Sequence, residues 1–182
     1  MPDSACEKPA LNSLMRALLA VWLVLTLAPA GAGPTSLRGE PRIILGDRLV
    51  VAGTLVRLAG IDAPEDGQSC RLANGRIYDC GRISTTALMD LTAGVGVVCD
   101  MTGESLGGLP LATCRAGGYD LSKGMVHTGW ALAWPRTGTV YAAVEGAARK
   151  ARRGLWRGRF DMPWDRRRGV RAAIRSAVPP AK

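Results

Sequence analysis

The fold of this chain is most constrained by short β-rich runs that turns interrupt after a few residues. Three such runs cover Arg42 to Ile44, Leu49 to Val51 and Thr54 to Leu58, and the Ala52-Gly53 pair marks a turn before the third run. Brief runs of this kind, bounded by turn residues, are typical of strands. The sequence therefore predicts that the folded part of the chain begins with a meander of strands.

Helical and strand-like segments alternate in the rest of the chain. Gln68 to Asp79 holds glycine and asparagine turn signals and is interpreted as a loop, whereas Gly81 to Leu91 has apolar residues at helical spacing. The other expected elements are a hairpin of Val95 to Val98 and Leu111 to Cys114, a short helix capped by Asp120 that runs through His127 to Gly129, a strand at Ala131 to Trp134 and a helix at Val140 to Arg153.

This order of elements predicts an α+β fold that is mainly β. About five short strands, with one helix between the third and fourth, are typical of a five-stranded Greek-key barrel of the oligonucleotide-binding type, here with about three helices. A chain of 182 residues has room for one such domain. We assign residues 42–158 to the barrel domain, 33–41 to a linker and 159–182 to a basic C-terminal tail.

Residues 1–32 have the order of a secretory signal peptide. Lys8 and Arg16 precede the apolar run Ala17 to Leu27, and small residues from Ala28 to Gly33 follow it. The apolar run is shorter than the roughly 20 residues that span a bilayer comfortably. We therefore expect a periplasmic or secreted domain after cleavage, and the alternative is a domain held outside the cytoplasm by an uncleaved N-terminal anchor.

Export permits disulfide bonds, and four cysteines remain once Cys6 is removed with the signal peptide. Four cysteines can pair in three ways. Cys99 and Cys114 each end one run of the expected hairpin, so they would face each other across it and leave Cys70 to pair with Cys80. A tetrathiolate zinc site is the alternative, but it needs close Cys-x-x-Cys pairs, which this sequence lacks.

The net charge of +9 comes from the C-terminal part of the chain. Residues 149–182 hold 12 lysines and arginines against two aspartates, whereas residues 33–148 hold 10 basic and 11 acidic residues. A basic tail suits nucleic acid, anionic lipid or an anionic cell envelope, and charge alone does not distinguish these partners. We interpret the run Arg166-Arg167-Arg168 as a solvated helix end first and as a nucleic-acid contact second.

Carboxylates and arginines gather in two segments that hairpin geometry can bring together. One segment is Leu45 to Arg48 at a strand junction, and the other runs from Val56 to Glu65 off the end of a strand. Three carboxylates with no cysteine or histidine beside them make a hard oxygen-ligand site suited to Ca²⁺ or Mg²⁺. An arginine among them can bind a phosphate oxygen and stabilise charge in a five-coordinate transition state. These residue types predict a metal-assisted phosphodiesterase site.

With these motifs, the chain resembles the thermonuclease, or staphylococcal nuclease-like, family from about Arg42 to Trp156. The strongest match is the strand-end segment Val56 to Glu65, with the Gly46-Asp47 pair upstream of it. The four cysteines also stand where exported bacterial relatives have theirs. Further matches are Asp120-Leu121-Ser122 with Val126, Gly129 to Ala133 and the closing Gly154-Leu155-Trp156.

The resemblance implies Ca²⁺-dependent hydrolysis of nucleic-acid phosphodiester bonds. Asp47 and Asp62 would be Ca²⁺ ligands, and the backbone carbonyl of Ala63 would be a third. Glu65 would act as the general base for the attacking water, and Arg57 would hold the scissile phosphate. Single-stranded DNA or RNA would be the partner, with a further contact of the basic tail to an anionic envelope. We expect a monomer with no protein partner.

Two departures from the family pattern bear on activity. The family's Asp-Gly-Asp-Thr is here Leu45 to Arg48, so one outer carboxylate is absent and a cation stands beside a predicted metal ligand. Leu109 occupies the position of the family's second arginine, and no arginine lies between Arg82 and Arg115. Because such a donor commonly contributes several powers of ten in rate, we expect a weakened nuclease.

Two alternatives to a weakened nuclease remain. One is a catalytically inactive member of the family that binds nucleic acid or another polyanion through the same groove. The other is a cell-envelope protein in which the barrel is only a scaffold. Among the tryptophans, Trp134 lies near a strand end and suits either packing or base stacking, whereas Trp130 and Trp156 are interpreted as packing residues.

Overall fold

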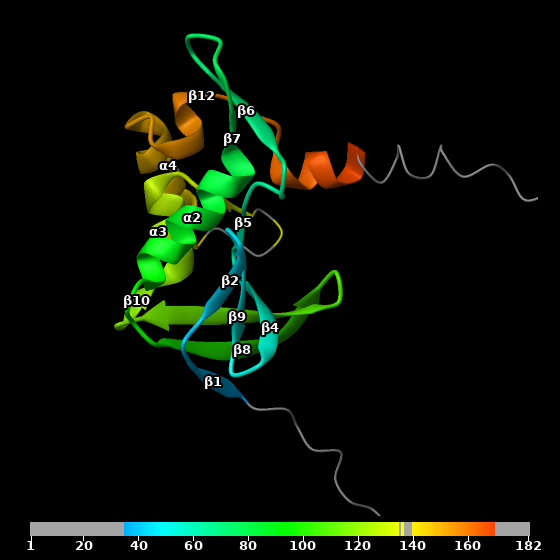
Figure 1. Ribbon diagram of the computed structural model, residues 1–182, viewed down its shortest axis with the longest axis vertical. Helices are drawn as coiled ribbons and strands as arrows, with labels where there is room; N and C mark the ends of the chain where they lie inside the picture. Colours follow the sequence, from blue (N-terminus) through cyan, green and yellow to red (C-terminus); the bar gives the residue numbers. More distant parts are fainter. Residues whose placement is uncertain (1–34, 135, 137–139, 170–182) are drawn as a thin grey trace, which may run out of the picture. The chain divides into compact units, whose positions relative to one another are not determined.

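A computed structural model describes residues 35–134, 136 and 140–169 of the chain. As the sequence predicts, the fold is mixed α+β with mainly strands, and its largest sheet has seven strands (Figure 1). Neighbouring strands in this sheet run antiparallel, except that β4 and β9 are parallel. Its order is β1 (Ser36–Gly39), β8 (Val97–Leu106), β9 (Leu109–Ala116), β4 (Thr54–Leu58), β3 (Arg48–Val51) and β2 (Arg42–Leu45), with β10 (Tyr119–Asp120) paired to β9.

Strand β1 lies in the segment that the sequence analysis assigns to a linker. Its residues pair with β8, and Leu37 stands opposite Cys99 with only 5% of its surface exposed. The linker interpretation is therefore wrong for residues 36–39. One buried leucine among polar and glycine residues is too weak a local pattern to predict a strand, which here exists because β8 offers it a partner.

The remaining strands form two smaller sheets. One pairs β5 (Ile61–Asp62) with β11 (Leu132–Ala133), and the other joins β12 (Gly158–Arg159), β6 (Ser69–Leu72) and β7 (Ile77–Asp79). The segment interpreted as a loop, Gln68 to Asp79, therefore contains a β6–β7 hairpin. The strands are short, and only Cys70 and Leu72 of β6 alternate with exposed polar residues, so the turn residues between the strands dominated the sequence pattern.

Three of the helices lie close to their predicted positions. They are α2 (Cys80–Thr92), α3 (Leu121–Thr128) and α4 (Ala142–Lys150), and they gather at one end of the strands in Figure 1. Asp120 caps α3 by accepting a hydrogen bond from the Lys123 amide, and Gly129 ends the helix with a φ of 77°. Both predicted signals are thus present, because only glycine adopts that φ without strain. A 3₁₀ turn, η2 (Gly154–Arg157), follows, and residues 163–169 are helical.

The buried side chains form two clusters. The larger one lies between the main sheet and the helices and includes Leu49, Val56, Leu88 and Met125. The smaller one includes the buried Cys70, Cys80, Leu132 and Leu155, and the partly buried Phe160, Met162 and Trp164 pack against it. Phe160, Met162 and Trp164 therefore belong to the folded domain, although the sequence analysis places them in the basic C-terminal tail of residues 159–182.

The two predicted disulfides, Cys70–Cys80 and Cys99–Cys114, are both present. Cys99 and Cys114 are direct register partners on β8 and β9, which explains why they can be joined across the hairpin. Disulfides indicate an oxidising compartment, periplasmic or extracellular. The predicted signal peptide lies outside the described residues. No helix in the described part of the chain is long and apolar enough to cross a membrane.

Candidate functional site

The two acidic segments meet where β2, β3, β4 and β5 approach one another. Asp47 lies in the turn before β3, Arg48 begins β3 opposite Arg57 of β4, and Asp62 ends β5. The Leu58 amide donates a 2.9 Å hydrogen bond to the Asp47 carbonyl, which holds the turn against β4. The predicted site residues are therefore brought together by strand pairing.

Gly46 lets the turn approach the rest of the site closely. A Cβ at this position would lie 1.9 Å from Ser84 Oγ of α2 and 3.0 Å from the Ala63 Cβ. Since any side chain would push the turn away from Ser84 and Ala63, glycine is required here for the two segments to meet. Ala63, the residue after Asp62 in the chain, is buried.

Arg57 bridges two buried aspartates. Its Nη2 lies 2.7 Å from Asp47 Oδ2 and 2.6 Å from Asp62 Oδ1, and none of the three residues is more than 4% exposed. Burial raises the pKa of Asp47 to about 6, while the nearby guanidinium of Arg57 lowers it. Because buried charges are tolerated only with partners, these three side chains act as one unit.

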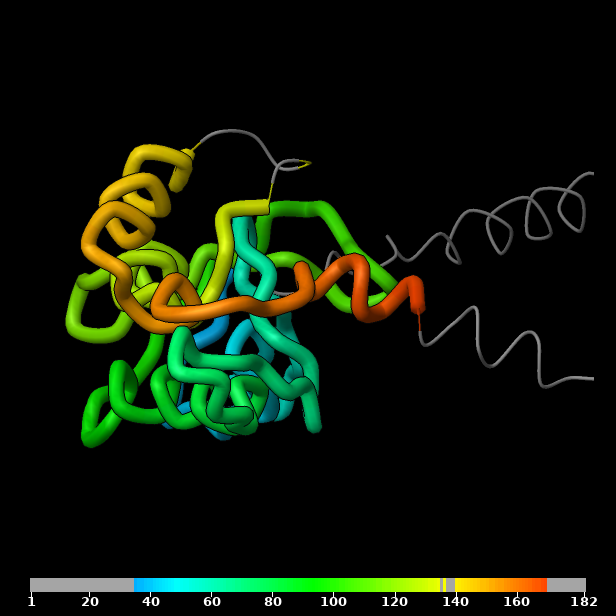
Figure 2. Tube along the Cα trace, turned by 90° about the horizontal axis from the view of Figure 1, so that it is seen from above, coloured from blue at the N-terminus to red at the C-terminus, as the bar shows by residue number. Residues whose placement is uncertain are grey.

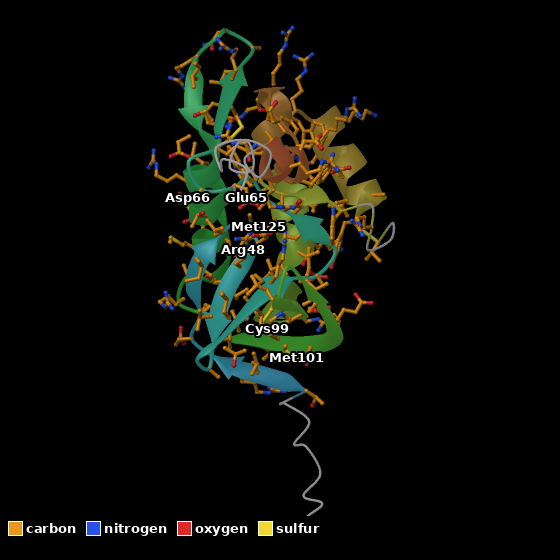
Figure 3. All side chains as sticks on the ribbon, turned by 90° about the vertical axis from the view of Figure 1, so that its right-hand side faces the viewer. Arg48, Glu65, Asp66, Cys99, Met101 and Met125 are labelled. Atoms are coloured by element: carbon orange, nitrogen blue, oxygen red, sulfur yellow. A yellow bond between two sulfur atoms is a disulfide. The ribbon has the colours of Figure 1, made fainter. Side chains whose placement is uncertain are left out.

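Glu65 lies beside this unit and is paired with Arg48. Arg48 Nη2 lies 3.2 Å from Glu65 Oε2, while its Nε lies 3.4 Å from Asp47 Oδ1; Figure 3 shows Arg48 and Glu65 in the same part of the molecule. The Glu65 amide donates to Gln68 Oε1, and Gln68 Nε2 donates to the Asp161 carbonyl. Buried Gln68 therefore ties the loop of Glu65 to the segment that leads into helical residues 163–169.

Arg167 completes the site, and the sequence analysis missed it. Its Nη1 donates a 2.9 Å hydrogen bond to Asp62 Oδ1, and it also contacts Asp62 Oδ2 and Glu65 Oε1. The side chain is only 18% exposed. The interpretation of residues 166–168 as a solvated helix end is thus wrong for Arg167. Figure 2 shows the segment that carries it, orange to red, running across the domain after α4.

The charges of the site balance. Burial lowers the pKa of Arg167, but hydrogen bonds to Asp62 and Glu65 outweigh this effect and raise the pKa above its ordinary value. Arg48, Arg57 and Arg167 thus face the carboxylates of Asp47, Asp62 and Glu65, and each carboxylate contacts at least one guanidinium. A signal for Arg167 was present in the sequence. Phe160, Met162 and Trp164 precede it, and apolar residues of this density indicate packing rather than a solvated tail.

A cavity of about 660 Å³ opens onto these side chains. Trp134 stands in its wall, with the guanidinium carbons of Arg57 and Arg136 lying 5.9 and 5.8 Å from the ring centroid, within cation–π range. The Nε atoms of Arg48 and Arg57 are buried and form no hydrogen bond, although Arg48 Nε lies 3.4 Å from Asp47 Oδ1. The cavity is lined by five arginines, two tryptophans, Glu65 and a short apolar edge, namely Arg48, Arg57, Arg136, Arg167, Arg168, Trp134, Trp164, Glu65, Leu106, Gly107 and Leu109.

Comparison with known proteins identifies the family. The staphylococcal nuclease homologue family matches residues 55–158. A similar protein is the succinoglycan biosynthesis protein ExoI of Rhizobium meliloti (strain 1021), which is 32% identical over 159 residues, 86% of this chain and 82% of that protein. The chain therefore belongs to the staphylococcal nuclease homologue family, whose members are nucleases and generally depend on calcium.

The side chains of this site, as arranged here, do not fit Ca²⁺. That ion takes about six to eight oxygen ligands. In the described part of the chain no three acidic, histidine or cysteine side chains form a metal-binding group. Arg57 Nη2 stands between Asp47 Oδ2 and Asp62 Oδ1, and Arg167 contacts both oxygens of Asp62. The oxygens predicted to bind the metal already face guanidinium groups, and the Ala63 carbonyl stays a predicted ligand.

Proposed function

We propose that this chain binds single-stranded DNA or RNA through the arginine- and tryptophan-lined cavity, and that it hydrolyses phosphodiester bonds weakly. The observation that carries the proposal is the lining of the cavity, where five arginines surround two tryptophans. Guanidinium groups bind phosphate oxygens in a directed way, and tryptophan rings stack on bases. Stacking needs unpaired bases, which favours a single strand over a duplex.

One buried donor is compatible with an anionic ligand. The Nε atom of Arg57 is shielded from solvent and has no hydrogen-bond acceptor, whereas Arg48 Nε lies 3.4 Å from Asp47 Oδ1. A buried donor without an acceptor costs about 1–3 kcal/mol, which a phosphate oxygen would recover if the bound ligand turned this nitrogen toward the cavity. Arg57 lines the cavity, so a bound phosphodiester would lie beside its side chain.

Hydrolysis is the second candidate function, and the position of Glu65 favours it. Glu65 and Arg57 line the same cavity, so a water activated by Glu65 could attack a phosphate held by Arg57. Glu65 must first separate from Arg48 and Arg167, because its carboxylate oxygens face these guanidinium groups, and the attacking water needs one of these oxygens free. Leu109 also lines the cavity, and it offers no hydrogen bond to a leaving oxygen.

The binding proposal is tested by fluorescence anisotropy with labelled single-stranded DNA and RNA. We expect Arg136→Ala, which removes an exposed cavity arginine, to weaken binding about fivefold, or ~1 kcal/mol. Arg38→Ala removes an equal charge from exposed β1 and should leave binding close to wild type. Equally weakened binding in the two variants would contradict a specific role for the cavity.

Competition and cleavage assays separate the remaining hypotheses. Because the similar R. meliloti protein is named for succinoglycan biosynthesis, an acidic polysaccharide such as heparin is the competitor to use. We compare heparin and unlabelled oligonucleotide as competitors at equal concentrations of anionic groups. If heparin displaces the labelled oligonucleotide only at a much higher concentration than the unlabelled one does, the result supports a nucleic-acid site. If the two competitors are equally effective, the result favours a general polyanion site. Products from single-stranded substrates in chelator as well as in Ca²⁺ would support weak hydrolysis by the site as it is arranged here, whereas products that require Ca²⁺ would support a metal-dependent nuclease and contradict the misfit of this ion.

A further inference from the structure

In this structure the positive charge that contacts both Asp62 and Glu65 is the side chain of Arg167. Arg167 touches both oxygens of Asp62 and one oxygen of Glu65, the predicted metal ligand and the predicted general base. We infer that Arg167 takes the place of a divalent cation, so that the cavity binds a phosphodiester through guanidinium groups alone. The phosphodiester part of this inference rests on the proposed function, and the cation part does not.

Asp62 needs a positive charge beside it, supplied either by a metal ion or by a side chain. Its side chain is fully buried, and an ionised carboxylate without water is stable only beside positive charge. Arg57 cannot supply all of it, because its Nη2 is shared between Asp62 and Asp47. Arg167 provides the second positive charge, and it contacts Asp62 through two nitrogens in a forked geometry.

Apolar packing, as well as ion pairing, holds Arg167 at this position. Phe160, Met162 and Trp164 pack against the smaller core cluster, and Pro163, at the start of the helical residues, is buried. Trp164 and Arg167 are three residues apart on a helical segment, so they share a face, and both line the cavity. The guanidinium is therefore delivered by a folded segment and not by a free tail.

Arg167 retains hydrogen-bonding capacity for a ligand. A guanidinium has five N–H donors, and the contacts with Asp62 and Glu65 engage three of them. With the three carboxylates already neutralised, the exposed Arg136 leaves the cavity positive toward a phosphodiester. A Ca²⁺ ion would instead add two charges beside three guanidiniums, and this repulsion opposes its binding.

Calorimetric titration of CaCl₂ into protein purified from the periplasm tests the cation part without nucleic acid. We expect Arg167→Ala to bind Ca²⁺ at least about tenfold more tightly than wild type, a difference of ~1.4 kcal/mol. Arg166→Ala is the matched control, because it removes the same charge from an exposed neighbour that does not line the cavity. It should bind Ca²⁺ as wild type does. Wild type that binds Ca²⁺ as tightly as Arg167→Ala would overturn the inference.

A second variant keeps the test decisive if Arg167→Ala does not fold. Arg167→Gln keeps most of the side chain's length while removing its charge, and thermal unfolding shows whether each variant is folded. If Arg167→Ala does not fold, the same tightening is expected of Arg167→Gln. A folded Arg167→Gln with wild-type Ca²⁺ affinity contradicts a cation-replacing role.

The phosphodiester part is tested by oligonucleotide binding in chelator and in Ca²⁺. Wild type should bind equally in both, whereas Arg167→Ala should bind several-fold more weakly in chelator and recover with Ca²⁺. Wild-type binding that requires Ca²⁺ would overturn the inference. If no variant binds an oligonucleotide but Arg167→Ala still gains Ca²⁺ affinity, the proposed function fails while the assignment of Arg167 as the site's cation stands.

Discussion

Two arginine-lined cavities among the described residues differ in what stands opposite their arginines. In the first, Arg48, Arg57 and Arg167 face three carboxylates. The second, of about 580 Å³, has four exposed arginines and Trp156, and no carboxylate among the described residues that line it. These four arginines are Arg71, Arg152, Arg157 and Arg159.

Because of this difference, we expect selective anion binding in the first cavity and general anion binding in the second. Arg48, Arg57 and Arg167 of the first cavity are held by ion pairs, so a ligand meets these donors at fixed places. In the second cavity, Arg71 and Arg157 donate to the backbone carbonyls of Gly75 and Gly154, and no carboxylate of the described residues pairs with them. Such charges attract any polyanion without specifying its shape. We therefore expect the first cavity to determine what binds and the second to determine how strongly salt weakens it.

The largest expected effect is on stability. Arg57→Ala would leave Asp47 and Asp62 buried without their shared guanidinium, which should lower the free energy of unfolding by about 3–5 kcal/mol. Arg159→Ala in the second cavity should change it by less than about 0.5 kcal/mol, because its side chain is exposed. Urea unfolding measures both values. Similar values for the two variants would break the distinction between the cavities.

The next effect is a pH dependence that comes from Asp47, which is buried and paired with Arg57 of the first cavity. The pKa of Asp47 is raised by burial from 3.8 to about 6, so between these values the folded state holds a proton that the unfolded state has released. Stability from this group is present below about pH 4 and disappears as pH rises to about 6, by on the order of 3 kcal/mol. Comparing urea unfolding of wild type and Asp47→Asn across this range measures it. Parallel pH profiles would show that Asp47 does not titrate as expected.

A smaller effect concerns catalysis at the first cavity. Leu109→Arg combined with Arg167→Ala supplies a donor on the cavity wall and frees Asp62 and Glu65. We expect Ca²⁺-dependent cleavage of single-stranded DNA to rise at least about tenfold, equal to ~1.4 kcal/mol in the barrier. Adding Glu65→Ala should remove most of the gain. A folded double variant that cleaves no faster than wild type would favour the binding function over the nuclease.

The smallest expected effect is on salt dependence. Arg71→Ala with Arg159→Ala should reduce the slope of log affinity against log salt by roughly 0.7 for each single-strand phosphate that the variant no longer binds. Base and strand preference should stay unchanged, because both residues lie outside the first cavity. Oligonucleotide titrations at several salt concentrations measure the slope. An unchanged slope would show that the second cavity does not contact the oligonucleotide.

Local signals in the sequence determined much of the fold and part of the site. Thr54–Leu58 has its predicted bounds, and Asp120 and Gly129 begin and end α3 as predicted. Each depends on a few neighbouring residues, a turn, a cap or a left-handed glycine. The pairing of Cys99 with Cys114 was predicted because both belong to one expected hairpin, and they are register partners in it. The acidic and arginine residues were visible because their motif is contiguous.

Tertiary structure alone decided the partners of those residues. Strand β1 and the β6–β7 hairpin exist through pairing that their own composition does not predict. Arg167 lies 105 residues from Asp62 in the chain, and an arginine's charge carries no information about which carboxylate it meets. That choice depends on the packing of Phe160 and Met162, which brings the helical segment to the site. Ion pairs are selected by the three-dimensional fold because distance and burial, not sequence position, set their energy.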